Sequence, residues 1–96
     1  MIKPILNQPI KDLPREFIGR GEVKGYSFIQ IAASDSAYIY SVSSENGSVW
    51  YEVFKKTINR HFATTVYPKS NAFGRTAWTK PSEELAFELF FMITGI

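Results

Sequence analysis

Three glycines in the stretch FIGRGEVKGYSF, residues 17–28, have a spacing close to that of a phosphate-binding loop: Gly19, Gly21 and Gly25. Their pattern, G-x-G-x-x-x-G, is one residue longer than the dinucleotide fingerprint, which requires a strand before it and a helix after it. A β-rich run, YSFIQIAA, follows the glycines here. A kinase-type glycine loop does lie between strands, but it works with a catalytic loop and a metal-binding aspartate on a far longer chain. We therefore interpret the glycines as structural residues that allow a bulge or a close crossing in the first strand.

Side chains that bind metals or transfer protons are scarce. The chain has no cysteine and a single histidine, His61, so zinc lacks a ligand set. His61 is the only side chain whose ordinary pKa lies near neutral pH, and no motif places a serine beside it. The acidic residues are scattered, and no spacing indicates an oxygen-ligand site built from Asp35, Glu45 or Glu52. We therefore predict a protein that is not an enzyme and has no catalytic residues, no metal and no cofactor.

Basic and aromatic residues are interleaved in the run FKKTINRHFATTVYPKSNAFGRTAWTKP, residues 54–81. The segment 53–82 has no acidic residue, although the net charge of the whole chain is only +2. Basic side chains neutralise phosphates, aromatic rings stack on unpaired bases, and a sheet can present both to a nucleic acid. The leading hypothesis is therefore a small binding module with a nucleic-acid-binding face, although the sheet-type RNA signature is missing. The residues of this face are Trp50, Phe54, Lys55, Lys56, Arg60, Lys69, Arg75 and Lys80.

The alternation of apolar residues predicts the strands that position this segment. Residues 22–33, 36–43 and 48–57 have the pattern of a three-stranded antiparallel meander. Asn46 and Gly47 between the second and third strands favour a tight hairpin turn, because both residues tolerate positive φ.

Two further short strands are predicted after the meander. They are TTVY at 64–67 and RTAWT at 75–79, with a turn at SNAFG between them. We expect a single α+β domain over residues 1–96, in which an antiparallel sheet of four or five strands is packed by one C-terminal helix. Residues 1–17 are an extended proline-rich arm, 18–80 are mainly strands, and 82–94 are the helix.

The predicted helix has caps at both ends but an unusual distribution of apolar residues. Ser82 or Thr79 can cap its start, and Gly95 can close its end. Apolar side chains extend around most of its circumference, whereas one sheet face buries about a third to a half of such a helix. Phe87 and Phe91 therefore need a second cover, for which the arm and another subunit remain open alternatives.

Prolines determine the expected character of the arm. Pro4, Pro9 and Pro14 fix φ and donate no amide hydrogen, which favours an extended chain, although Asp12 with Pro14 could start one helical turn over residues 15–18. These prolines also interrupt every apolar run, so the arm does not have the pattern of a secretory signal. The C-terminal run LAFELFFMI is too short to span a bilayer. A cytoplasmic protein without membrane partners is expected.

Two runs, YEVFKKTINRHF at 51–62 and YPKSNAFGRTAWT at 67–79, carry a resemblance to a known family. They resemble small, function-unassigned proteins from anaerobic gut-type bacteria that are often associated with mobile elements, and the resemblance covers residues 18–80. It implies no catalytic or binding residues, and it is compatible with a DNA-linked or host-interaction accessory role. The alternative hypothesis is a protein-interaction or assembly module, with a protein partner or a homodimer formed through Phe87 and Phe91 or through a sheet edge.

Overall fold

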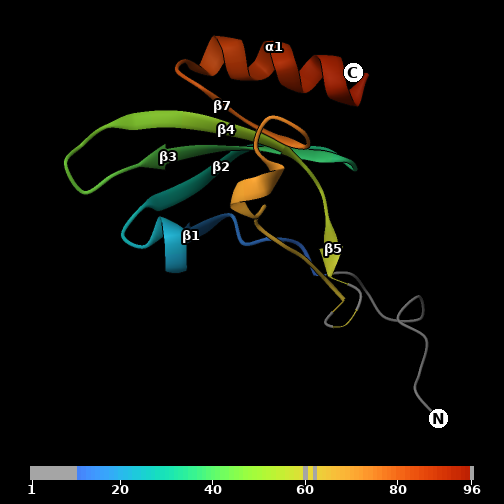
Figure 1. The fold of residues 1–96 in the computed structure, drawn as a ribbon. Coiled ribbons are helices and arrows are strands. Elements are labelled where there is room, and N and C mark those ends of the chain that lie inside the picture. Colours follow the sequence, from blue (N-terminus) through green and yellow to red (C-terminus); the bar gives the residue numbers. More distant parts are fainter. Residues whose placement is uncertain (1–10, 60, 62, 96) are drawn as a thin grey trace.

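The computed structural model describes residues 11–59, 61 and 63–95, which form a curved antiparallel sheet with one helix across its convex face (Figure 1). The elements follow the chain in the order β1 (Glu16–Ile18), η2 (Gly21–Val23, a 3-10 turn), β2 (Ser27–Ala33), β3 (Ala37–Ser43), β4 (Val49–Lys55), β5 (Ile58–Asn59), β6 (Thr64–Thr65), η3 (Ser70–Ala72, a second 3-10 turn), β7 (Ala77–Lys80) and α1 (Glu83–Thr94). The strand order of the main sheet is β1-β2-β3-β4-β7, and β5 pairs with β6 separately. The predicted fold class is confirmed.

The predicted meander is present as β2, β3 and β4. The β3–β4 hairpin is closed by residues 44–48, in which the Ser44 N–H donates to the Ser48 carbonyl at 2.9 Å. Gly47 has a φ of 91°. Asn46 does not take positive φ, and its Oδ1 instead accepts a hydrogen bond from the Ser48 N–H at 3.1 Å. The connection is therefore longer than the tight turn that the sequence predicts, because only the glycine adopts the left-handed conformation.

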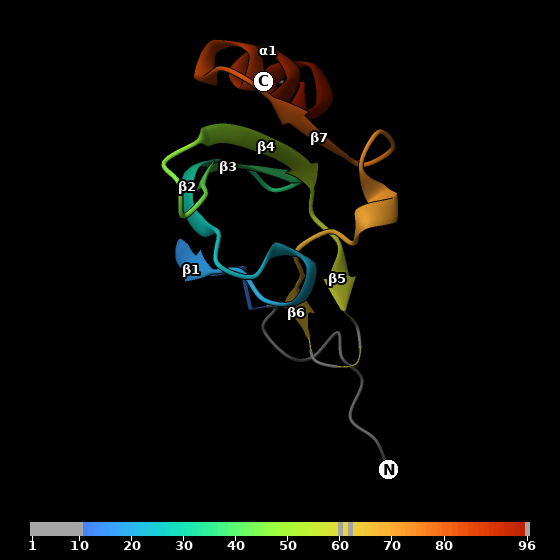
Figure 2. The ribbon, with the colours of Figure 1, turned by 60° about the vertical axis from the view of Figure 1, so that its left-hand side comes forward.

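The concave face of the main sheet carries an aromatic core. Its fully buried side chains from β2, β3 and β4 include Phe28, Tyr38, Tyr40 and Phe54. Residues 11–26 and 64–73 contribute the partly buried side chains that cover this core, and both segments lie on the side of the sheet away from α1 (Figure 2). The cover is irregular chain with short strands and 3-10 turns, so it has no helical or strand periodicity of its own.

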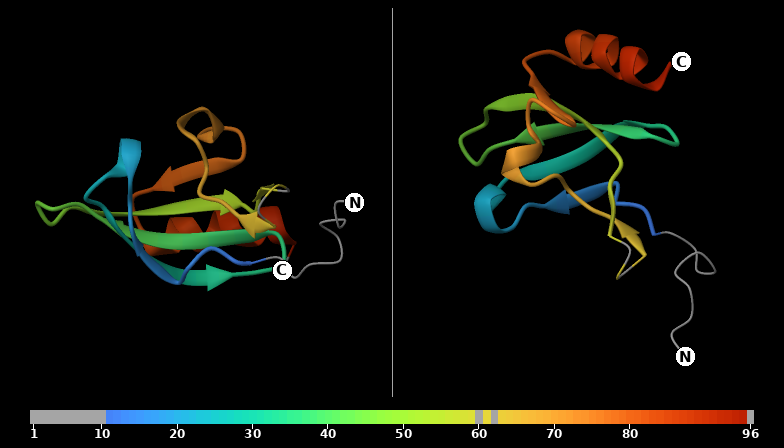
Figure 3. Two further views of the ribbon diagram at one scale, coloured as in Figure 1. Left: turned by 90° about the horizontal axis from the view of Figure 1, so that it is seen from below. Right: turned by 45° about the vertical axis from the view of Figure 1, so that its right-hand side comes forward.

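The convex face is covered by α1, which runs along the strands and packs on β3, β4 and β7 (Figure 3). Ala86 and Phe90 are buried there. The predicted caps are confirmed, because Ser82 Oγ accepts a hydrogen bond from the Leu85 N–H at 3.2 Å and Gly95 has a φ of 73°. No helix in the described part of the chain is long and apolar enough to cross a membrane.

The helical turn proposed over residues 15–18 was wrong. Glu16–Ile18 is strand β1, which pairs antiparallel with β2. Phe17 points to the concave face and stacks on Phe28, with 4.6 Å between ring centroids, while Glu16 and Ile18 on either side are exposed. An alternation in which only the central, aromatic side chain is partly buried suits a strand. Residues 1–10, which hold Pro4 and Pro9 of the predicted arm, lie outside the described residues.

The glycine-rich stretch connects β1 to β2 and contains η2, so the first meander strand begins at Ser27 and not at residue 22. Gly19 allows a close crossing, because a Cβ atom there would lie 2.2 Å from the Val23 carbonyl oxygen. The structural interpretation of this glycine is confirmed. The bulge lies elsewhere, in β2 between Gln30 and Ala32.

Candidate binding surfaces

The two aromatic residues of the predicted nucleic-acid face are held by the fold. Phe54 is 0% exposed and belongs to the concave core, so its placement on a binding face was wrong. Trp50 is half-buried, and its Nε1–H donates to Glu52 Oε2 at 3.0 Å. These side chains project from the same face of β4, and that face is covered by residues 64–73. Alternation identifies a shared face but does not show whether another segment covers it.

The basic residues of the predicted face are divided between the two sides of the sheet. Lys55 shares the face of β4 that packs against α1, and Lys80 pairs with Tyr51 of that same face. Lys56 lies on the other side, where its Nζ is 3.3 Å from Asp12 Oδ1 and 4.8 Å from the centroid of the Tyr38 ring. Of the other three basic residues, Lys69 lines a cleft on the concave side, Arg75 is exposed before β7, and Arg60 lies outside the described residues. The described cations of this set are therefore not gathered on one face.

The outer surface of α1 exposes large apolar side chains. Phe91 is 46% exposed, Met92 79% and Leu85 42%, whereas Phe87 is half-buried. At 100° per residue, Phe87 and Phe91 form one stripe and Leu85 and Met92 another. Residues 11–18 lie on the opposite side of the sheet from α1 and so do not cover Phe91 (Figure 1). The sequence indicated the apolar circumference but did not single out Met92, the most exposed of these side chains.

Two acidic residues lie next to these apolar stripes. Glu84 and Glu88 are exposed and lie between them, on the side of α1 opposite the sheet. The helix has no basic residue in its last turn and begins with Glu83 and Glu84. The outer surface of α1 is therefore both apolar and acidic. We call Leu85, Phe91, Met92, Glu84 and Glu88 the α1 surface.

Glu52 is a buried carboxyl group on the concave side. It is 5% exposed, and it pairs across the sheet with Tyr40 and Thr79. The Tyr67 hydroxyl donates to its Oε1, and the Trp50 indole donates to its Oε2. Burial raises the pKa of Glu52, and the two hydrogen bonds oppose that rise. Burial and the neighbouring carboxylate together raise the pKa of the Tyr67 phenol.

Glu52 borders a cleft of about 500 Å³, which we call the Glu52 cleft. Its walls come from the β1–β2 connection and from residues 67–73, between β6 and β7, and include Arg20, Val23, Tyr67, Lys69 and Phe73. The sequence offered one signal for this site, since Trp50, Glu52 and Phe54 alternate on one strand and place a carboxyl group between two aromatic rings. The approach of Tyr67 from a distant segment gave no signal.

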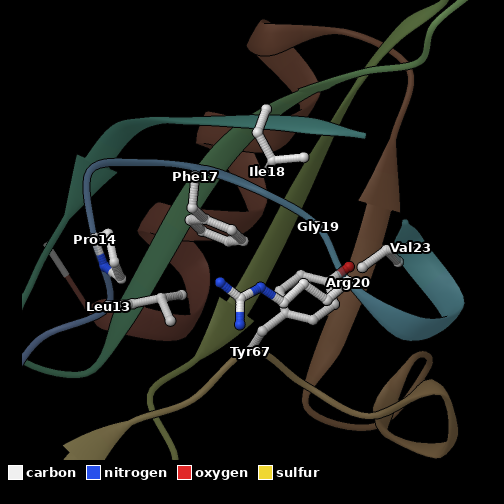
Figure 4. Close-up of a pocket in the computed structure, with 8 residues that line it drawn as sticks. All are labelled: Leu13, Pro14, Phe17, Ile18, Gly19, Arg20, Val23 and Tyr67. Atoms are coloured by element: carbon white, nitrogen blue, oxygen red, sulfur yellow. The ribbon is translucent and has the colours of Figure 1, made fainter. Parts of the chain in front are cut away.

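A second hollow of about 650 Å³ adjoins the Glu52 cleft and shares Arg20, Val23 and Tyr67 with it. In Figure 4 the side chain of Arg20 extends over this hollow, and Leu13 and Phe17 line it from the other side. Its lining is mainly apolar, with Arg20 as its cation. It therefore supplies an apolar extension to the Glu52 cleft, with no acid or base of its own.

A hydrogen-bonded cluster fixes residues 11–13 to the sheet. The Tyr38 hydroxyl donates to Asp12 Oδ1 at 3.0 Å and lies 2.8 Å from Thr65 Oγ1. The hydrogen bond from Tyr38 lowers the pKa of Asp12, burial opposes it with a smaller effect, and the hydrogen bond and charge of Lys56 lower the pKa further. This cluster is a joint between the first described residues, β3 and β6, so we assign it a structural role.

A scan against protein-family models and searches of curated proteins and of solved structures found no match to the chain. The resemblance to gut-bacterial proteins therefore stays a prediction. Within the described residues, no group of three or more histidine, cysteine, aspartate or glutamate side chains could hold a metal ion.

Proposed function

We propose that the protein is a non-enzymatic protein-interaction module that binds its partner through the α1 surface. The observation that carries this proposal is the exposure of Phe91, Met92 and Leu85 at 46%, 79% and 42% on a helix whose other side is already packed on the sheet. Leu85 and Met92 lie side by side in one stripe, and Phe91 packs beside Phe87 in the other. Exposed apolar side chains that are grouped in this way are typical of interaction sites.

Charge selects the kind of partner. Glu84 and Glu88 lie between the two exposed apolar stripes, and α1 carries no basic residue over Glu83–Thr94. A partner segment that places lysine or arginine beside its own apolar residues would neutralise both carboxylates. Docking of an amphipathic segment against a helix uses apolar anchors one turn apart, as Phe87 and Phe91 are. The proposed partner is therefore a basic amphipathic segment of another protein.

The size of the α1 surface argues against a stable homodimer. A fully exposed side chain of this size presents about 200 Å², so the exposed parts of Leu85, Phe91 and Met92 sum to roughly 300 Å². Stable interfaces bury about 800 Å² on each partner. A parallel contact between two copies would also bring acidic stripes together. A weak, exchangeable partner fits the available area better than a second copy.

Nucleic-acid binding receives less support from the same geometry. The described cations are divided between both sides of the sheet, Phe54 is buried, and Trp50 donates its indole N–H to Glu52. Stacking on bases requires an exposed ring face, and phosphate binding is strongest where cations converge. Nucleic-acid binding stays a prediction that an oligonucleotide titration can test.

The test uses two synthetic peptides of equal length, one with leucine on one helical face flanked by lysine and the other with glutamate in place of lysine. We expect the lysine peptide to bind the wild-type protein at low salt, with binding weakened at high salt, and the glutamate peptide not to bind. Phe91→Lys with Met92→Lys should abolish binding. Ile58→Lys is the control for the introduction of a lysine, because it adds one positive charge at an exposed apolar residue of β5, far from α1 (Figure 1), where the double variant adds two.

Three results would overturn the proposal. One is failure of the lysine peptide to bind, and another is equal binding of both peptides. The third is a dimer in light scattering that the Phe91→Lys, Met92→Lys variant converts to monomer, since the occupant of the α1 surface would then be a second copy.

A further inference from the structure

Glu52 lacks a cationic partner. Among the residues that the structure describes it is the only buried acidic side chain, and no described cation forms an ion pair with it. Its two oxygens accept hydrogen bonds from Tyr67 and Trp50, one each. An ionised carboxylate oxygen has two lone-pair sites, so each oxygen can accept another hydrogen bond. A buried carboxylate that is hydrogen-bonded but not neutralised favours a ligand with positive charge.

The Glu52 cleft gives such a ligand access to the carboxylate. Its volume of about 500 Å³ lies within the range of small-molecule sites. Tyr67 and Phe73 supply aromatic walls, and the two exposed cations Arg20 and Lys69 also line the cleft. Glu22 is an exposed acidic residue of the same lining, so the exposed positions hold two positive groups and one negative group. The exposed part of the cleft is therefore positive on balance, opposite the negative group at the buried position.

We propose that the Glu52 cleft binds a small primary amine that also carries a carboxylate, as an amino acid does, with its ammonium group at Glu52 and its carboxylate toward Arg20 and Lys69. The ammonium group supplies the missing charge partner of Glu52 and up to three hydrogen-bond donors. The apolar walls contact the carbon chain between the two charged groups. This site is on the opposite side of the sheet from α1, so it is independent of the proposed protein-interaction function.

Binding should depend on pH in a defined direction. Because burial raises the pKa of Glu52, a part of the protein holds a neutral carboxyl group in weakly acidic solution. An ammonium ligand favours the ionised carboxylate, so its affinity should rise as the pH rises through the pKa of Glu52. The groups that face Glu52 are Tyr67, Trp50, and Tyr40 and Thr79 of the adjacent strands, and the charged groups around the cleft are Arg20, Glu22 and Lys69. Glu83 is exposed at the start of α1, on the other side of the sheet, so Glu83→Gln is the matched control for Glu52→Gln.

Three probes that share a five-carbon chain separate the contributions of the ammonium group and the carboxylate to binding: 5-aminopentanoate, pentylammonium and pentanoate. The readout is the NMR resonance of the Trp50 indole N–H, which donates to Glu52 and therefore reports on its oxygen. We expect both amines to shift this resonance, 5-aminopentanoate to bind more tightly than pentylammonium, and pentanoate to leave it unchanged. Glu52→Gln should weaken amine binding about tenfold or more, because a hydrogen bond to a charged group is lost. Glu83→Gln should bind like the wild type.

Two further variants test the roles of the exposed cations and of Tyr67. Arg20→Gln with Lys69→Gln should remove the advantage of 5-aminopentanoate over pentylammonium. If Glu52→Gln does not fold, Tyr67→Phe retains the carboxylate and frees one of its lone pairs, so it should bind amines at least as tightly as the wild type. The proposal is overturned if neither amine shifts the resonance in the wild type or in Tyr67→Phe, if pentanoate shifts it equally, or if Glu52→Gln binds unchanged. An advantage of 5-aminopentanoate that is absent, or that survives loss of both cations, overturns the assignment of its carboxylate.

Discussion

Replacement of Phe54 by alanine is expected to lower the free energy of unfolding by about 3–5 kcal/mol, because the ring is removed from a closed core. The side chain is 0% exposed. Its ring centroid lies 5.6 Å from that of Tyr40, to which it is nearly parallel, 5.5 Å from that of Tyr38 and 5.6 Å from that of Tyr67. Each aromatic pair contributes about 0.5–1.5 kcal/mol beyond the area it buries, which favours the upper part of the range.

The effect should be large against the total stability of the domain, which is about 5–15 kcal/mol for a protein of ordinary stability. Urea unfolding followed by tryptophan fluorescence measures it, with the midpoint expected to shift and the slope to stay constant. Phe54→Leu retains more of the volume and should lose less than Phe54→Ala. Val49→Ala is the control in the same strand, because Val49 is exposed and its truncation should change stability by no more than about 0.5 kcal/mol. A loss below about 1 kcal/mol in Phe54→Ala would show that the ring is exposed, as the nucleic-acid hypothesis assumed.

Four shorter predictions concern charge and backbone. Burial raises the pKa of Glu52, so the native state binds this proton more tightly than the unfolded state. The stability that this group contributes should be present below its unfolded pKa of about 4.3 and be lost as the pH rises through its native pKa, and Glu52→Gln should remove that dependence in urea titrations at several pH values. The lowered pKa of Asp12 has the opposite sign, so its small contribution should be lost as the pH falls through its native pKa, and the pH profile of Asp12→Asn should lack this step. Gly19→Ala should be strongly destabilising in thermal unfolding, because its Cβ would lie 2.2 Å from the Val23 carbonyl oxygen, and a variant as stable as the wild type would contradict the crossing. A labelled oligonucleotide at low salt should bind no more tightly than about 10⁻⁴ M, with no change in Lys55→Gln, Arg75→Gln, and micromolar binding that falls steeply with salt would restore the nucleic-acid hypothesis.

The parts of the fold that the sequence predicted are those defined by neighbours along the chain. The meander strands follow from alternation, and α1 follows from its caps at Ser82 and Gly95. Strand β1 was missed because its three residues pair with β2 and its one core side chain, Phe17, stacks on Phe28 of that strand, and neither contact has a signal within the segment. A segment of three residues with one partly buried side chain is compatible with a strand and with a turn, so the sequence pattern alone does not distinguish the two.

The candidate sites depended more on which segments cover the sheet. β4 is apolar on both faces because α1 covers one face and irregular chain covers the other. Composition alone could not distinguish this arrangement from an exposed aromatic face, so Phe54 was assigned to the wrong environment. The Glu52 cleft was missed for the same reason, since Tyr67 reaches the carboxylate from a residue 15 positions away in the sequence.

The irregular chain that covers the concave core is expected to open locally before the meander does. The β2–β3–β4 meander joins segments that are adjacent in the sequence, whereas the Thr64 hydroxyl donates to the Lys11 carbonyl across 53 positions. Contacts between distant segments close large loops, so their formation costs more conformational entropy and they form late in folding. The same segments open first under native conditions, with a free energy below that of global unfolding. Amide hydrogens of Lys11 and Thr65 should therefore exchange with solvent well before those of Ile39 and Val53. Because Tyr67 of the Glu52 cleft follows Thr65 by two residues, this opening would also loosen one wall of the cleft while the meander stays closed.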